Sequence, residues 1–276
     1  MKNYKLLIAI LSLGLLSLLG CRSIGTKNRI DREREEIEKK ETWRSQLPIA
    51  DTTPTRPTLP KIRQTVLSNG LTVIVVEDSR LPIAQINLVL KAGSAQDPYG
   101  YAGLSHLTAL MLKEGTKKKT GLELAEDLAN LGTELSVNVA KDLTQFSSAV
   151  LTNKVEDVVS LIAAMVQEPR MAEDDFARVK LLQKSALASE QGVLTYVAQT
   201  TFLMAAYGEK HPYAFPSGGT LKTVSHIELK DIKKAHASYY GSNIAALIAV
   251  GDVTLGQITA LAKQHFGTWK KTSSVK

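Results

Sequence analysis

Residues 63–269 switch repeatedly between a two-residue and a helical hydrophobic period, and this order constrains the fold more than any other feature of the sequence. Alternating apolar and polar residues predict half-buried strands at 83–91, 135–139 and 144–150, and a continuous apolar run predicts a buried strand at 244–250. Apolar residues at helical spacing predict helices at about 102–113, 120–131, 153–168, 175–207, 225–240 and 255–266.

Turn and capping residues support these boundaries. Asn69-Gly70 lies between two strand-like runs and predicts a hairpin with positive φ at both turn positions. The pairs Thr120/Glu123 and Ser225/Glu228 have capping-box spacing and predict helix starts, and Gly192 predicts a break in the longest helix. Hairpins and helices are segregated along the chain, so we predict an α+β fold, with an antiparallel-rich mixed sheet and helices packed on one face.

The N-terminus carries a targeting signal. Lys2 and Lys5 precede an apolar run at residues 6–19, which is short for a membrane-spanning helix and typical of a signal peptide. The run ends at Leu18-Leu19-Gly20-Cys21, which resembles a bacterial lipobox: the small Gly20 admits the signal peptidase, and the Cys21 thiol accepts the diacylglycerol. An ordinary secretory signal, or an anchor helix with an incidental cysteine, are the alternatives.

Cys21 is the only cysteine of the chain, which favours the lipoprotein interpretation and leaves no intramolecular disulfide. We therefore predict a signal peptide at 1–20 and lipid attachment at Cys21. Three acyl chains would make the anchor effectively permanent. Arg22 stands where a retention signal would carry Asp, so the predicted location is the bacterial cell envelope, at the periplasmic face of the outer membrane.

Composition limits the classes of partner. The net charge is +7, and loss of Lys2 and Lys5 with the leader leaves 32 basic and 27 acidic residues, or +5. The basic run 117–119 has no aromatic platform beside it, so we expect a solvated loop and no nucleic-acid binding. Residues 21–61 combine a charged stretch with four prolines and predict a semi-rigid tether, which leaves 62–276 as the folded domain.

Four sequence blocks within the folded region resemble one family. They are Leu67-Ser68-Asn69-Gly70-Leu71-Thr72-Val73; Ala92-Gly93-Ser94 through Gly103-Leu104-Ser105-His106 to Glu114-Gly115-Thr116; Tyr207-Gly208 through His211-Pro212-Tyr213 to Gly219-Thr220; and Val250-Gly251-Asp252-Val253. In this order they resemble the N-terminal domain of M16 (insulinase/pitrilysin-type) zinc peptidases. The resemblance implies an α+β sandwich, two of which face each other in the family as a clamshell around an extended peptide.

The resemblance also identifies a metal-site helix, and here that helix is degenerate. Active family members read His-x-x-Glu-His, in which the two histidines share one zinc and the glutamate deprotonates the metal-bound water. This chain reads His106-Leu107-Thr108-Ala109-Leu110. His106 matches the first ligand, but Ala109 stands at the general base and Leu110 at the second ligand, and neither can bind a metal or accept a proton.

The family's third ligand, a glutamate on the following long helix, is missing too. Its expected position falls at 185–187, and the nearest carboxylate, Glu190, lies one turn or about 5.4 Å further along, against a tolerance of about ±0.2 Å for a metal bond. His211 belongs to a family loop motif and is expected to bond backbone. We predict no zinc and no catalytic residue, with His106 left over from a lost site. The other histidines, without paired spacing, are His226, His236 and His265.

Three functions remain open. The first is a non-catalytic subunit that supports peptide binding and proteolysis by a catalytic M16 partner, often encoded beside it. The second is a lipid-anchored peptide-binding or scaffold module, and the third is an active peptidase with a rearranged site. The family's second domain does not follow before Lys276, so a lone domain is expected to expose an apolar patch larger than the few hundred Å² usual for a monomer.

Overall fold

The computed structural model describes residues 31–37, 39–41 and 60–273. The chain divides into two units between residues 58 and 59. In the first unit, residues 31–37 and 39–40 are helical, and their side chains are exposed. The predicted signal peptide, Cys21 and the proline-rich part of the predicted tether (residues 48–57) lie outside the described residues. No helix among the described residues is both long and apolar enough to cross a membrane.

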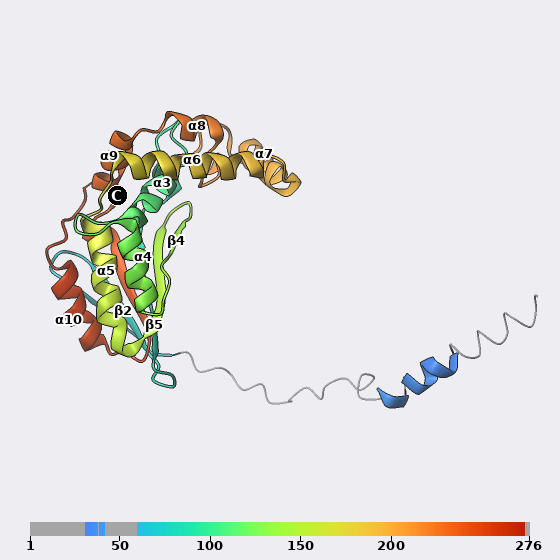
Figure 1. The fold of residues 1–276 in the computed structure, drawn as a ribbon, viewed down its shortest axis with the longest axis horizontal. Helices are drawn as coiled ribbons and strands as arrows, with labels where there is room; N and C mark the ends of the chain where they lie inside the picture. The colour runs from blue at the N-terminus through green and yellow to red at the C-terminus, as the bar shows by residue number, and fades with distance from the viewer. Residues whose placement is uncertain (1–30, 38, 42–59, 274–276) are drawn as a thin grey trace, which may run out of the picture. The chain divides into compact units, whose positions relative to one another are not determined.

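The second unit, Leu59–Lys276, is built on one six-stranded sheet with the order β1-β2-β6-β3-β5-β4 (Figure 1). β2 and β6 run parallel, and the other neighbouring strands are antiparallel. The strands are β1 (Ile62–Val66), β2 (Thr72–Glu77), β3 (Ile83–Leu90), β4 (Ser136–Val139), β5 (Thr144–Leu151) and β6 (Ala245–Gly251).

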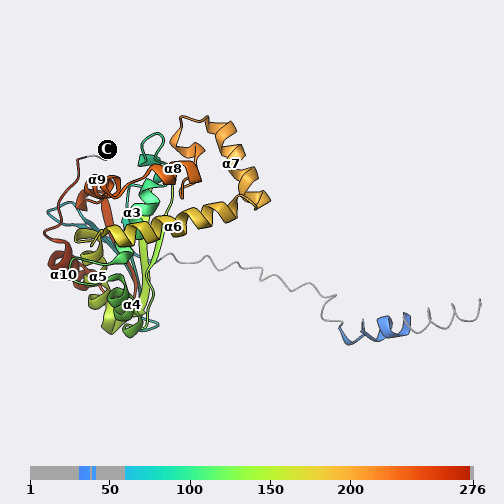
Figure 2. The same cartoon turned by 45° about the horizontal axis from the view of Figure 1, so that its top comes forward.

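Helices cover one face of this sheet, as predicted (Figures 1 and 2). Alternate strand residues such as Leu88, Phe146 and Leu247 are fully buried beneath the helices, whereas their neighbours Asn87 and Ser147 are only half-buried on the open face. The covering helices are α4 (Gly121–Asn130), α5 (Val155–Gln167) and α10 (Leu255–Phe266). The whole hydrophobic core, from Leu67 to Trp269, lies within this unit, which therefore has the core it needs to fold alone.

A second group of helices lies at one end of the sheet (Figure 1). α3 packs beside α6, α9 and β4. α6 and α7 are separated at residues 191–193, where Gly192 predicts a break, and α7 extends away from the domain body (Figure 2). These helices are α3 (Leu104–Met111), α6 (Glu173–Glu190), α7 (Leu194–Tyr207), α8 (Leu221–His226) and α9 (Leu229–Tyr239).

Two local predictions are wrong. The helix expected at 225–240 is two helices, because Ile227 between them is extended and buried. Glu228 caps α9 through Asp231, while the Ser225 hydroxyl donates to the Leu221 carbonyl instead of capping. In the predicted Asn69-Gly70 turn, only the glycine has positive φ (88°).

Candidate functional site

The start of α3 is fixed by a carboxylate from the preceding loop. Asp97 Oδ2 accepts the Gly103 amide proton at 2.9 Å, and Oδ1 accepts the Ser105 amide at 2.8 Å and the Ser105 hydroxyl at 2.5 Å. Two otherwise unpaired amides at the helix start are thereby satisfied. Burial raises the pKa of Asp97 to about 6, although the hydrogen bonds from Ser105 and the backbone act to lower it.

Close backbone contact holds α3 from the other side. Gly103 has a φ of 96°, and a Cβ there would lie 2.8 Å from the Gly218 carbonyl oxygen. Thr223 Oγ1 donates to the Ala102 carbonyl at 2.7 Å. Gly218 and Thr223 both follow the His211-Pro212-Tyr213 motif in the sequence. The segment after that motif therefore holds the start of α3 in place.

His106 lies half-buried on α3 and faces α6. Burial lowers its pKa, and a hydrogen bond with the Gln183 side chain partly offsets that shift. Gln183 Nε2 also donates to the Gly218 carbonyl at 2.9 Å, so this amide links α3, α6 and the loop before α8. The imidazole is thus engaged with an amide and not with a carboxylate.

The other two motif positions carry hydrocarbon. Ala109 is fully buried, and the partly buried Leu110 packs against the hydrophobic core. One imidazole beside a neutral amide does not fit a zinc site, which needs at least three protein ligands. Within the described part of the chain, no three His, Cys, Asp or Glu residues lie close enough to hold a metal ion.

The residue of α6 that reaches His106 differs from the expected one. Ser185 and Ala186 are exposed and Leu187 is buried in the core, while Glu190 is exposed and hydrogen-bonds Tyr196. Gln183, two residues before the expected segment, takes the position facing α3. The sequence spacing could have identified Gln183. It lies four residues after Val179 and four before Leu187, which are both buried, so Gln183 is a polar residue on the buried face of α6.

Two of the remaining histidines make hydrogen bonds with the backbone, as expected for His211. His211 Nδ1 accepts the Tyr213 amide proton at 3.1 Å. His236 Nε2 bonds the Val166 carbonyl at 2.8 Å, and His265 Nε2 lies 4.0 Å from a Glu156 oxygen. The Tyr213 hydroxyl donates to the Asp142 carboxylate at 2.6 Å. This bond connects the loop that contains His211 to the β4–β5 turn. His226 is exposed.

β4 forms the edge of the sheet next to α3. It pairs with β5 on one side, and no described strand pairs with its other side. Ser136 and Asn138 are exposed, whereas Val139 is buried. An open strand edge therefore runs past the helix that carries His106.

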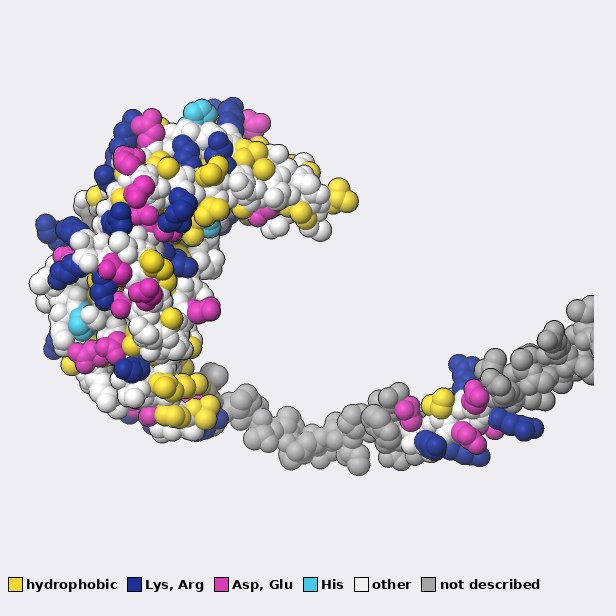
Figure 3. Space-filling model, in the orientation of Figure 1, with side chains coloured by type: hydrophobic (Ala, Val, Ile, Leu, Met, Phe, Trp, Pro, Cys, Tyr) yellow, Lys and Arg dark blue, Asp and Glu magenta, His cyan; other side chains and the backbone are white. Residues whose placement is uncertain are grey.

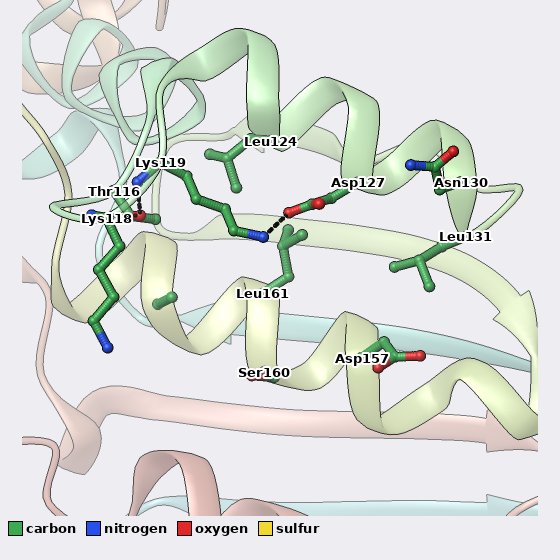
Figure 4. A pocket seen from close by; sticks show the side chains of 11 residues that line it. Thr116, Lys118, Lys119, Leu124, Asp127, Asn130, Leu131, Asp157, Ser160 and Leu161 are labelled. Carbon is green, nitrogen blue, oxygen red and sulfur yellow. Dashed lines mark hydrogen bonds and ion pairs between the residues drawn. The ribbon is translucent and has the colours of Figure 1, made fainter.

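A separate groove of about 390 Å³ lies between α4 and α5, away from α3 (Figure 4). Leu124, Leu131 and Leu161 line it, and an ion pair between Lys119 and Asp127 lies along its α4 side (Figure 4). This groove lies on the helical layer and contains no residue of the degenerate motif.

Comparison with known proteins identifies the family. Residues 72–212 match the sequence profile of insulinase (peptidase family M16), and residues 226–276 match that of the peptidase M16 inactive domain. The fold and the first match, which spans just over half of the chain, define a domain of the zinc-metallopeptidase type. The chain belongs to peptidase family M16. β6 lies between β2 and β3, so the two matched stretches contribute to one sheet.

Relatives of this chain are about twice as long. The zinc protease PqqE of Helicobacter pylori is 26% identical over 222 residues, covering 77% of this chain and 48% of that protein. The mitochondrial-processing peptidase subunit beta of Bos taurus is 26% identical over 214 residues, covering 76% and 42%. The crystal structure of a peptidase M16 inactive domain from Pseudomonas fluorescens has a TM-score of 0.73 at 28% identity, covering 78% of this chain and 52% of that one. The chain thus spans about half the length of these relatives.

Proposed function

We propose that this chain is a non-catalytic M16 subunit that supports peptide binding and proteolysis by a catalytic M16 partner at the cell envelope. The observation that carries the proposal is the degenerate α3, where His106 meets Gln183 while Ala109 and Leu110 are apolar. Without a carboxylate at position 109 no general base is available, and without a second histidine the metal has too few ligands. The proposal therefore includes the absence of zinc.

The exposed α7 helix supports a protein partner. None of its 14 residues is buried, and none is charged. Leu194, Phe202 and Tyr207 are 86%, 68% and 47% exposed, and hydrophobic side chains are visible along the α6–α7 arm (Figure 3). Exposed apolar side chains that gather on one element mark an interaction surface, and the polar residues of α7 are uncharged threonines and one glutamine. The arm is therefore the surface on which the partner is proposed to dock.

The relatives are consistent with an assembly of this kind. The Bos taurus relative is a subunit of the mitochondrial-processing peptidase. A catalytic partner of this chain would carry an intact His-x-x-Glu-His helix. The outer edge of β4 could then pair with an extended peptide, since strand addition to an open edge supplies main-chain hydrogen bonds.

The cell-envelope setting rests on the N-terminal sequence. The basic residues, the apolar run and Cys21 together have the order of a lipoprotein signal. We propose that the mature chain is anchored to the membrane through Cys21, at the periplasmic face of the outer membrane.

Two measurements test the proposal. Elemental analysis of residues 60–276 is expected to give no stoichiometric zinc. Co-expression with a catalytic M16 chain encoded nearby is expected to give a complex by pull-down, and peptide cleavage by that chain should change when this one is added. The double variant Leu194→Asp/Phe202→Asp is expected to abolish the complex, whereas Leu122→Asp on α4, where the leucine is 72% exposed, should not.

Other outcomes favour the alternatives. One zinc per chain, lost together with a peptidase activity of this chain alone, would support a rearranged active site. A monomer that neither binds such a partner nor alters its cleavage rate would support the lipid-anchored peptide-binding or scaffold module.

A further inference from the structure

The open face of the sheet is apolar at the end where β1 begins. Hydrophobic side chains gather there, at the lower end of the domain in Figure 3. They come from the start of β1, the β2–β3 turn, the start of β3 and the ends of β5 and β6. We call these residues the edge patch: Ile62 (69% exposed), Leu81 (62%), Ile83 (46%), Leu151 (53%) and Val250 (39%).

Strand register places these side chains on one surface. Val250 pairs with Val76, and Val76 pairs with Ile62, while Ile83 pairs directly with Leu151. Residues opposite each other on neighbouring strands project from the same face. Val250 lies opposite Gln85 on β3, two residues from Ile83 on the same face, and Val250 and Ile83 line one depression. The two groups therefore meet diagonally and form one patch with Gln85 between them.

Backbone contacts hold the turns of the patch in place. The Thr152 amide donates to the Pro82 carbonyl at 3.0 Å, and the Asp252 amide donates to the Ile83 carbonyl at 2.9 Å. Leu81, Ile83 and Val250 also line a shallow depression of about 490 Å³. The surface is thus preformed and can contact a partner without rearrangement of its backbone.

The charges at the patch are few. The Arg80 side chain, next to Leu81, is 87% exposed and pairs with Asp78 through Nη2 and Oδ2 at 2.6 Å. This pairing neutralises the charge beside Leu81, while the exposed Lys61, next to Ile62, adds one positive charge at the β1 side. The long side chain of Arg80 can reach polar headgroups while its methylenes stay with Leu81.

We propose that the edge patch docks on the surface of a phospholipid bilayer. Ile62, the first residue of β1, lies at the margin of the patch, and the chain that precedes it carries the predicted acylation site at Cys21. Forty residues separate Cys21 from Ile62. Nine of them are helical, and the other 31 can span at most about 100–110 Å, so an anchor alone would not fix the orientation of the domain. Contact through the patch would hold the open sheet face toward the membrane and leave α3 and α7, at the other end of the domain, accessible.

Vesicle flotation of residues 60–276 tests the patch without the anchor. Vesicles of phosphatidylethanolamine and phosphatidylglycerol are expected to carry the wild-type domain, and binding should persist at high salt because aliphatic burial drives it. Leu81→Asp/Leu151→Asp is expected to weaken partitioning by at least about tenfold, since each leucine loses an apolar contact. Leu122→Asp and Leu194→Asp/Phe202→Asp are matched controls and should bind like wild type. All substituted side chains are exposed, and circular dichroism with thermal melting confirms that each variant is folded.

Several results would overturn the proposal. Equal binding by wild type and the Leu81/Leu151 variant would place the membrane contact elsewhere, and loss of binding only in the α7 variant would assign it to that arm. Binding abolished by salt would show an electrostatic contact. No flotation, together with a dimer that the Leu81/Leu151 variant disrupts, would make the patch an interface between two copies. None of these results bears on the zinc content or the M16 partner, so this inference can fail independently of the proposed function.

Discussion

Asp97 offers a direct test of how α3 is held, because its ionisation is expected to destabilise the fold. The carboxyl is buried at the start of α3, and burial raises its pKa to about 6, whereas an unfolded chain has an Asp pKa of about 3.9. The folded state therefore binds the proton more tightly. The stability that this provides is fully present below about pH 3.9 and is lost as the pH rises through about 6.

The size of the effect follows from the shift. A difference of about two pKa units corresponds to about 3 kcal/mol in the free energy of unfolding. The Asp97→Asn variant cannot titrate at this position, although its amide replaces one of the two oxygens that accept the Gly103 and Ser105 amides. Its stability at any single pH can differ from that of wild type for this reason. The informative quantity is the wild-type value minus the variant value, followed as a function of pH.

Urea unfolding of residues 60–276 and of its Asp97→Asn variant, measured from pH 4 to pH 7.5, gives that difference. We expect it to fall by about 2.5 kcal/mol across this range, because the unfolded Asp is already partly ionised at pH 4, and to be flat above pH 7. All other ionisable groups are common to both proteins, so their contributions cancel. A difference that stays constant, or that rises with pH, would show that the hydrogen bonds to Asp97 outweigh its burial and would refute the reasoning.

Three further changes have defined outcomes. Phe146→Ala removes a fully buried ring and should cost about 3–5 kcal/mol of unfolding free energy by urea denaturation, whereas the exposed Leu122→Ala should change it by less than about 0.5 kcal/mol. Gln183→Leu leaves the His106 imidazole without its amide partner and should cost about 1–3 kcal/mol without altering zinc content; an unchanged melting curve would contradict the described contact. Cys21→Ser should abolish palmitate labelling and leave the uncleaved precursor, and equal labelling of both proteins would refute the lipid anchor.

The central strands of the sheet were predictable because β3 and β5 each have one buried and one open face. The alternation of Ile86, Leu88 and Leu90 with polar neighbours reports this asymmetry directly, and the structure buries all three. The break between α6 and α7 was predictable from Gly192. The split between α8 and α9 was not predictable, because Ser225 and Glu228 have the spacing of a capping box. In the structure, the buried and extended Ile227 separates the two helices instead.

The sequence predicts a degenerate motif at the site, but it does not predict the contacts of the motif residues. Ala109 and Leu110 can be recognised in the motif without coordinates, because their side chains have no donor or acceptor. The residue of α6 that contacts His106 depends on the rotation of α6 relative to α3. Counting residues from His106 along the sequence locates that position only to within one helical turn. The apolar stripe of α6 was the better guide, since it places Gln183 inward and the residues at 185–186 outward. The role of Asp97 was missed because it acts from a loop six residues before Gly103.

The contacts that position α3 explain how a family site can be lost while the fold remains. Asp97 holds the helix start, Gly103 packs against the loop before α8, and Gln183 links His106 to the same loop. None of these contacts involves a metal, so each of them would persist in the zinc-free chain that we propose. Hydrocarbon at positions 109 and 110 strengthens the packing of α3 instead of leaving buried polar groups unpaired. The two apolar surfaces that we propose as contacts, α7 and the edge patch, lie at opposite ends of the domain (Figures 1 and 3), so the proposed protein contact and the proposed membrane contact would not compete.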